Sequence, residues 1–267
     1  MSRTLSEVFD DTRSHDRAAL IGYLPAGFPD ARRAVELITD MVAAGVDIVE
    51  VGLPYSDPLM DGPDIQAAVD QALTSGATPD VVLDTVAQVV AAGATALVMS
   101  YWNPIERYGT DRFADRMASA GGAGVITPDL TPEEAGAWIS ATDRAGLDRV
   151  FLVAPSSTDQ RIETVAAVTS GFLYAASTMG VTGARTQVSS AAPGLVRRAR
   201  ALTDLPIAVG LGVSTGDQAS EVAAYADGVI VGSAFVRRIL QAPDHESARA
   251  GVRELAAELA EGVRRRP

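Results

Sequence analysis

The chain contains no cysteine, no lysine and only two histidines, and each shortage removes a class of chemistry. Without cysteine there is no disulfide framework, no thiolate zinc site and no cysteine nucleophile. All 22 cationic residues are arginines, so a Schiff-base lysine and covalently attached pyridoxal phosphate are also excluded. His15 and His245 lie near the chain ends, where we expect solvated side chains rather than a general base or a metal ligand. Carboxylates, tyrosines and backbone amides remain to carry any reaction.

Excess positive charge and long apolar runs are also missing. The formal net charge is −12 and the isoelectric point is near 4.6, which argues against general binding to nucleic acids or to anionic membranes. The stretch Met1–Leu20 has no apolar signal core, and no apolar run is long enough to span a bilayer. The sequence therefore favours a cytoplasmic protein, and its 47% hydrophobic residues are enough for a large core.

Short β-branched runs alternate with amphipathic helical patterns along the whole chain. Eight such repeats in 267 residues predict an α/β fold, a single (β/α)8 TIM barrel domain covering residues 1–267. We expect an extra N-terminal helix at Leu5–Thr12 and a charged helix, Glu246–Arg266, outside the barrel. A doubly wound sheet is the alternative, although it usually has fewer strands. The predicted strands are Ala19–Leu24, Ile48–Leu53, Ala96–Tyr101, Gly124–Thr127, Val150–Ala154, Phe172–Ala175, Ile207–Gly210 and Val229–Val231.

The segment Asp47–Gln66 carries the strongest functional signal. Its strand is apolar on both faces, as in a parallel sheet covered on both sides, except for Glu50. A buried carboxylate is costly without a partner, and burial raises its pKa. No arginine lies inside any predicted apolar strand, so a functional Glu50 is favoured over a structural ion pair. A second carboxylate, Asp61, follows on the loop after this strand.

Two connections are longer than simple turns, namely Pro54–Asp64 after the second strand and Ser177–Ser190 after the sixth. Loops of this length are usually functional lids or disordered segments. Both follow strands, so both are expected on the carboxyl face, where barrel active sites are built. We interpret them as two mobile lids that face each other across the site.

Glycine-containing segments at three later strand ends predict a phosphate site: Gly180–Ala184, Gly210–Ser214 and Gly232–Ala234. Glycine lets the backbone approach an anion, and the third segment opens a helix whose first amides would point at it. Loops after the seventh and eighth strands commonly form phosphate sites in barrels. An apolar slot for an aromatic substrate is expected from Tyr23, Leu59, Tyr101, Ile126 and Tyr174.

The sequence resembles a known family, the α subunit of tryptophan synthase. The resemblance runs from about Arg17 to Val236, and its most specific part is the pattern of Glu50, Asp61 and the Gly, Pro, Ser and Asp residues around them. The stretches that carry it are PAGFPD (Pro25–Asp30), VEVGLPYSDPLMDGPDIQ (Val49–Gln66), YWNPI (Tyr101–Ile105), PDLTPEEA (Pro128–Ala135), FLVAPSSTDQRI (Phe151–Ile162), MGVTGART (Met179–Thr186), GLGVS (Gly210–Ser214) and VGSAFV (Val231–Val236).

The resemblance implies a lyase that cleaves indole-3-glycerol phosphate by a retro-aldol reaction into indole and glyceraldehyde 3-phosphate. It implies that Glu50 is the general acid and base and that Asp61 accepts the indole N–H. The implied substrate contacts are Tyr23, Tyr101, Ile126, Tyr174, Thr182, Gly183, Gly212, Val213, Gly232 and Ser233. Thr182 resembles a lid residue that meets Asp61 on closure.

The resemblance also implies a partner. Indole would pass to a β subunit in an α2β2 complex, and pyridoxal phosphate would belong to that subunit alone, with no cofactor in this chain. Two alternatives stay open from the residues: another phosphate-binding barrel enzyme, such as a sugar-phosphate isomerase or epimerase, and a non-catalytic subunit that activates a partner. Intact Glu50 and Asp61 argue against the second.

Overall fold

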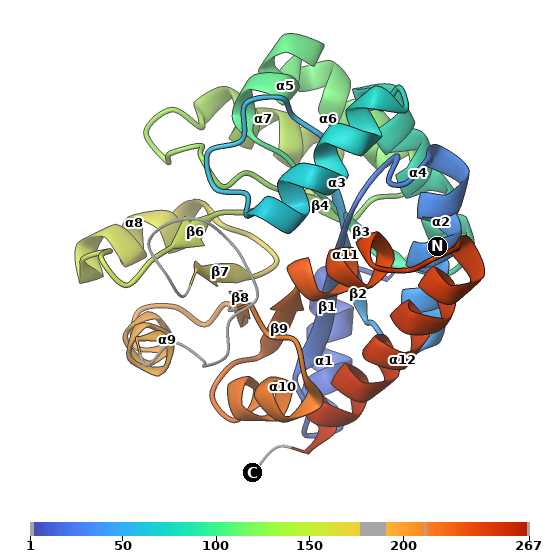
Figure 1. Cartoon of the computed structure of the whole chain (residues 1–267). Coiled ribbons are helices and arrows are strands. Elements are labelled where there is room, and N and C mark those ends of the chain that lie inside the picture. Colours follow the sequence, from blue (N-terminus) through green and yellow to red (C-terminus); the bar gives the residue numbers. More distant parts are fainter. Residues whose placement is uncertain (1–2, 177–190, 211, 266–267) are drawn as a thin grey trace.

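A computed structural model describes residues 3–176, 191–210 and 212–265. Its centre is a sheet of nine parallel strands, with neighbours in the order β5-β4-β3-β2-β1-β9-β8-β7-β6 (Figure 1). These strands are β1 (Ala19–Pro25), β2 (Ile48–Gly52), β3 (Thr95–Met99), β4 (Gly124–Ile126), β5 (Asp148–Val150), β6 (Leu152–Val153), β7 (Leu173–Ala176), β8 (Ile207–Gly210) and β9 (Gly228–Val231). The predicted TIM barrel is confirmed, since the strand order follows the chain around one ring.

The fifth predicted strand, Val150–Ala154, is corrected to two short strands. β5 pairs with β4 and β6 pairs with β7, and only Phe151 separates them. The carbonyl of Val150 accepts from Thr127 N–H (3.2 Å), and the carbonyl of Phe151 accepts from Tyr174 N–H (3.2 Å). The backbone thus changes partners at one residue, and the two edges of the sheet are joined through it. β5 and β6 together fill one of the eight barrel positions.

The helices lie around the outside of the strands (Figure 1). Short polar N-caps start several of them: the Asp30, Thr78, Thr158 and Thr215 side chains each accept a backbone N–H of the first turn. Those described are α1 (Leu5–Ser14), α2 (Ala31–Ala43), α3 (Pro63–Thr74), α4 (Pro79–Ala91), α5 (Trp102–Tyr108), α6 (Thr110–Ser119), α7 (Gly136–Ala145), α8 (Asp159–Val168), α9 (Ala192–Arg200), α10 (Gly216–Ala223), α11 (Ser233–Leu240) and α12 (His245–Arg264).

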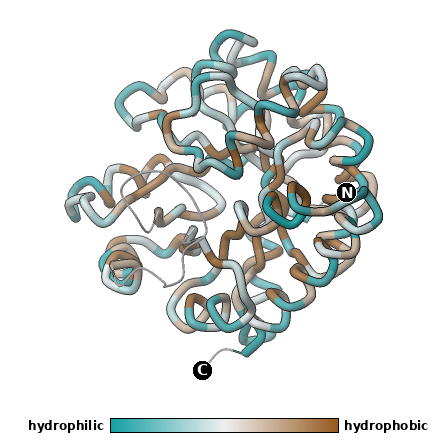
Figure 2. Tube along the Cα trace, in the orientation of Figure 1, coloured by the Kyte–Doolittle hydropathy of each residue, from teal (hydrophilic) through white to brown (hydrophobic). Residues whose placement is uncertain are grey.

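Side chains alternate along the strands between two apolar layers. Inward residues such as Ile48 form an inner cluster, whereas Val49 and Val51 join the larger cluster between strands and helices. Figure 2 shows the most hydrophobic segments at the centre and hydrophilic segments along the outer helices. This alternation places Glu50 on the same face as Ile48, toward the barrel interior.

The extra N-terminal helix is confirmed as α1, and it covers the amino-terminal end of the barrel. Thr4 and Glu7 form a capping box that fixes its first turn. Its buried Phe9 contacts Phe172 at 5.6 Å between ring centroids, within the inner cluster. At the other end of the chain α12 packs outside the barrel on α2, α10 and α11, as predicted. None of the described helices is long and apolar enough to cross a membrane.

Candidate active site

Glu50 stands in the middle of β2, in register with Tyr23 of β1 and Leu97 of β3. Only 1% of its surface is exposed, and its Oε1 atom has no hydrogen-bond partner among the described residues. Burial disfavours the charged form and raises the pKa of Glu50 to about 8. At neutral pH this carboxyl group therefore holds a proton that it can donate toward the barrel interior.

The prediction that no arginine lies inside a strand is wrong, because Arg149 lies in β5. Its guanidinium points away from the barrel interior, however. Nε donates to the carbonyl of Val168 (2.7 Å), and Nη1 donates to Thr142 Oγ1 (3.3 Å) and to Asp143. Among the described residues Glu50 forms no ion pair, so a functional Glu50 is still favoured over a structural one.

Two tyrosines flank Glu50 at the carboxyl ends of β1 and β7. Burial raises the pKa values of both Tyr23 and Tyr174, and the negative charge of Glu50 raises them further. Glycines make room for both rings. A Cβ atom added to Gly52 would lie 2.5 Å from Tyr23 Oη, and one added to Gly210 would lie 2.5 Å from Tyr174 Oη. Gly210, expected only as part of a phosphate loop, thus also has a packing role.

Asp61 lies on the loop between β2 and α3 and is held by Tyr101, which follows β3. Tyr101 Oη donates to Asp61 Oδ1 (3.1 Å) and accepts the N–H of Met60 (2.9 Å). Burial raises the pKa of Asp61, while the Tyr101 bond works in the opposite direction. Asp61 also raises the pKa of Tyr23, so Tyr23 lies within electrostatic reach of both carboxylates. The sequence did not predict the Tyr101–Asp61 contact.

The predicted phosphate residues after β8 and β9 begin two helices at the same end of the barrel. Ser233 is the first residue of α11 and is 7% exposed, with Gly232 at the N-cap. Gly212, with φ of +68°, and the buried Val213 precede α10. The first amides of α11 point out of a helix N-terminus, which suits an anion. Thr182, Gly183 and the whole connection Ser177–Ser190 lie outside the described residues.

Two other predicted slot residues differ in their surroundings. Ile126 at the end of β4 is fully buried in the inner cluster. Leu59 is 73% exposed on the loop after β2, so it stands outside the group formed by the tyrosines and the two acids. The described part of the chain thus brings Tyr23, Glu50, Asp61, Tyr101 and Tyr174 together through β1, β2, β3 and β7.

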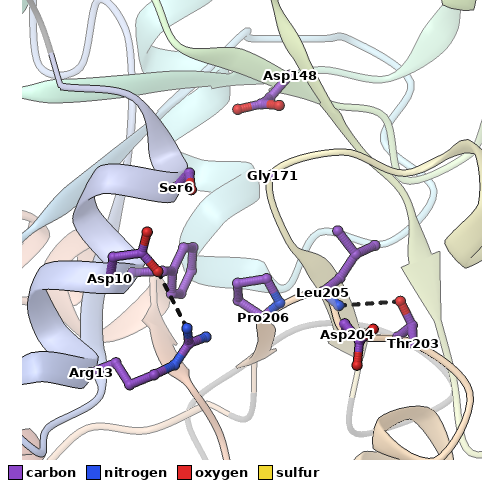
Figure 3. A pocket seen from close by; sticks show the side chains of 10 residues that line it. Ser6, Asp10, Arg13, Asp148, Gly171, Thr203, Asp204, Leu205 and Pro206 are labelled. Atoms are coloured by element: carbon purple, nitrogen blue, oxygen red, sulfur yellow. Dashed lines mark hydrogen bonds and ion pairs between the residues drawn. The ribbon is translucent and has the colours of Figure 1, made fainter.

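Two cavities of about 550 and 570 Å³ open at the opposite, amino-terminal end of the barrel. Figure 3 shows the first, with Ser6, Asp10 and Arg13 of α1 on one side and the turn 203–206 on the other. Both touch Asp148, whose pKa is raised by burial. Residues at this end of a barrel serve stability rather than catalysis. The described residues include no group of three or more His, Asp or Glu side chains that could hold a metal.

Comparison with known proteins agrees with this arrangement. The model of the family "Tryptophan synthase alpha chain" matches residues 9–264. The chain belongs to this family. The tryptophan synthase alpha chain of Thermobifida fusca is 60% identical over 257 residues, 95% of both chains. That of Mycobacteroides abscessus is 58% identical over 261 residues, 98% of this chain and 97% of the other.

Solved structures of the same family have the same fold. A chain of Mycobacterium tuberculosis tryptophan synthase superposes with a TM-score of 0.91 at 52% identity, covering 99% of both chains. The alpha subunit from Legionella pneumophila superposes with a TM-score of 0.87 at 30% identity. As a tryptophan synthase alpha chain, the protein is a lyase that cleaves indole-3-glycerol phosphate to indole and glyceraldehyde 3-phosphate. The indole passes to a β subunit.

Proposed function

We propose that Glu50 performs both proton transfers of this cleavage as a retro-aldol reaction. The protonated carboxyl, with its pKa near 8, gives its proton to C3 of the indole ring. The resulting carboxylate takes the proton of the hydroxyl on the attached side-chain carbon. The bond between that carbon and C3 breaks, its electron pair returns to the indole ring, and the former alcohol carbon becomes the aldehyde. Glu50 ends protonated, as it began.

In this proposal Asp61 stabilises the charge that develops on the indole ring. Protonation at C3 makes the ring nitrogen positive, and a carboxylate that accepts the N–H favours that state. The Tyr101 bond is to Oδ1, and we assign the indole N–H to Oδ2. Tyr23, Tyr101, Ile126 and Tyr174 would form the walls of the aromatic slot. The three tyrosines lie within hydrogen-bond or electrostatic reach of the two acids, and Ile126 belongs to the inner cluster of the barrel.

The phosphate group is assigned to the other side of the same barrel end. The amides at Gly232 and Ser233 and the turn at Gly212 and Val213 would hold it, together with Gly183 and Thr182. Support for the assignment comes from the N-terminus of α11, which directly follows β9 and has a glycine N-cap.

The observation that carries the proposal is a buried Glu50 whose Oε1 has no partner among the described residues, with Asp61 within electrostatic reach of the same tyrosine, Tyr23. The test is indole release from indole-3-glycerol phosphate by the purified chain, with and without its β subunit, for the native protein, Glu50→Gln and Asp61→Asn. We expect both variants to bind indole and to release it from substrate far more slowly. Native turnover in either one would refute the corresponding role.

We also propose that residues 1–267 form one barrel domain that works in the cytoplasm without a cofactor of its own. The continuous ring of strands, the lack of lysine and the acidic composition support these three statements. The complex would be α2β2, with pyridoxal phosphate in the β subunit. Mass measurement of the native complex and of its separated subunits tests the stoichiometry and the place of the cofactor.

A further inference from the structure

We propose that Tyr101 is a positioning residue whose hydroxyl group holds the Asp61 carboxylate in its working orientation and ionised state. The inference rests on the function proposed for Asp61. Tyr101 is also a proposed wall of the aromatic slot, and its hydroxyl gives it this second role.

The geometry of the contact fixes both the loop and the side chain. Tyr101 Oη accepts the backbone N–H of Met60 (2.9 Å) and donates its own proton to Asp61 Oδ1 (3.1 Å). One hydroxyl therefore binds the backbone before Asp61 and the carboxylate itself. Asp61 sits on a loop between Gly52 and Pro63, without a strand or helix of its own. The double contact ties it to the residues after β3, while Gln66 Nε2 of α3 donates to its carbonyl (2.7 Å).

Tyr101 itself is held from several directions. It is 7% exposed, and its ring centroid lies 5.7 Å from that of Tyr55. Its backbone is the N-cap of α5, and the next amide, Trp102 N–H, donates to Asp129 Oδ1 (2.8 Å) from the loop after β4. Asn103 Nδ2 donates to Tyr55 Oη (3.0 Å). Tyr101 is thus a fixed reference point against which a loop carboxylate can be aligned.

The charges around Asp61 show why its ionisation depends on this bond. The groups within reach of Asp61 from the described elements are Tyr101 after β3, which donates to it, and Tyr23 of β1, which also lies within electrostatic reach of Glu50; Asp64 at the start of α3 is paired with Arg237 (2.7 Å). Burial raises the pKa of Asp61, and the Tyr101 hydrogen bond lowers it. Loss of the hydroxyl should therefore leave Asp61 protonated up to a higher pH.

The experiment compares pH profiles of kcat/KM for indole release by the complex with its β subunit. The acid limb should report Asp61, which must be ionised, and the basic limb Glu50, which must be protonated. We expect Tyr101→Phe to move the acid limb upward by about one pH unit, because the lost hydrogen bond favours the charged form of Asp61. The basic limb should stay in place. Tyr55→Phe is the matched control, since it removes a neighbouring hydroxyl that does not contact Asp61, and its acid limb should not move.

A double variant separates positioning from general damage. In Asp61→Asn the carboxylate and the acid limb assigned to it are gone, so adding Tyr101→Phe should leave the pH profile unchanged and give a loss well below the product of the two single losses. Tyr101→Phe with lower kcat but an unmoved acid limb, or fully multiplicative losses, would overturn the inference. Native turnover in Asp61→Asn itself would instead refute the proposed function. Circular dichroism and the affinity for indole show whether each variant is folded.

Discussion

Asp47 lies just before β2 and Glu50 lies in its middle, three residues further on, and their surroundings differ completely. Asp47, just before β2, receives two hydrogen bonds from Arg17 (2.7 and 2.9 Å) and one from the N–H of Leu20 (2.8 Å). Glu50 is more deeply buried, yet its Oε1 has no partner among the described residues. Both are carboxylates near the same apolar core, but only the first has its charge compensated.

The difference separates a carboxylate that stabilises the fold from one that is kept for chemistry. Compensated carboxylates recur at the amino-terminal end of the barrel: Asp227 accepts from Arg200 (2.9 Å) and from the N–H of Ile207 (2.9 Å). At the carboxyl end the protein leaves Glu50 unpaired, which costs stability whenever the group is charged. We interpret this cost as what makes Glu50 an acid at neutral pH.

The largest effect is expected from Glu50→Gln, which keeps the shape of the side chain and removes its proton transfer. One general acid or base contributes about 10²–10⁴-fold, and Glu50 acts twice, so we expect turnover to fall by about 10⁴-fold or more. Asp47→Asn, the matched control on the same strand, should keep its rate per folded molecule. Single-turnover release of indole measures the rate of each variant. Equal losses in Glu50→Gln and Asp47→Asn would mean that the two carboxylates do not differ in role.

A smaller loss, about 10²-fold, is expected for Asp61→Asn. The amide keeps the size of the side chain and one acceptor oxygen, but it cannot offset the positive charge on the indole ring. The affinity for indole alone should change little, because free indole is neutral. Rate and affinity are measured on the same preparation, and a parallel loss of both would mean that Asp61 serves binding rather than the transition state.

The pH dependence of stability should differ by a few kcal/mol between the native protein and Glu50→Gln. Burial raises the pKa of Glu50 from its ordinary 4.5 to about 8 in the folded protein. The folded state therefore binds the proton more tightly than the unfolded chain. The stability contributed by this group is fully present below pH 4.5 and is lost as the pH rises through 8. The unfolding free energy of Glu50→Gln should therefore rise relative to that of the native protein with increasing pH. Urea unfolding at pH 5, 7 and 9 checks this, and a constant difference would contradict the raised pKa.

Asp47→Asn should cost about 1–2 kcal/mol of unfolding free energy. It leaves the largely buried Arg17 with only the more distant Asp11 (3.8 Å), while the amide oxygen can still accept from Leu20 N–H. Denaturant unfolding at pH 7 measures the change. A loss of stability here combined with a gain for Glu50→Gln at high pH would confirm that the two carboxylates act in opposite ways.

Features that depend on neighbouring residues could be predicted from the sequence, whereas contacts between distant residues could not. The apolar residues on both faces of β2 predicted that Glu50 is buried, because alternation is a local property of the strand; the structure shows that its face points into the barrel. The barrel followed from the repeat of strands and helices. The change of partners at Phe151 was not predictable, since a short run of apolar residues does not indicate which neighbour each one bonds.

Contacts between side chains far apart in the chain could also not be predicted from the sequence pattern. Tyr101 and Asp61 are 40 residues apart, and their bond depends on how two loops fold over neighbouring strands. Arg149 was expected outside the strands; its side-chain direction, outward to Val168, decided its meaning more than its position did. The glycines at 52 and 210 had a visible signal, a glycine at the end of a strand, but their purpose, room for Tyr23 and Tyr174, came from the packing.

The smallest effect is expected from adding a carboxylate where the carboxyl end should bind an anion. Ser233→Asp places a negative charge at the first residue of α11, beside the proposed phosphate position. The helix N-terminus would partly stabilise the new charge, by ~0.3–1 kcal/mol, but the charge would repel a phosphate. We expect the affinity for glyceraldehyde 3-phosphate to fall about tenfold, equivalent to ~1.4 kcal/mol, with indole binding unchanged because indole has no phosphate. Ser233→Asn, similar in size and uncharged, is the control. Calorimetric titration of each ligand into each variant checks the assignment, and equal weakening of both ligands in Ser233→Asp would show that the phosphate does not bind at α11.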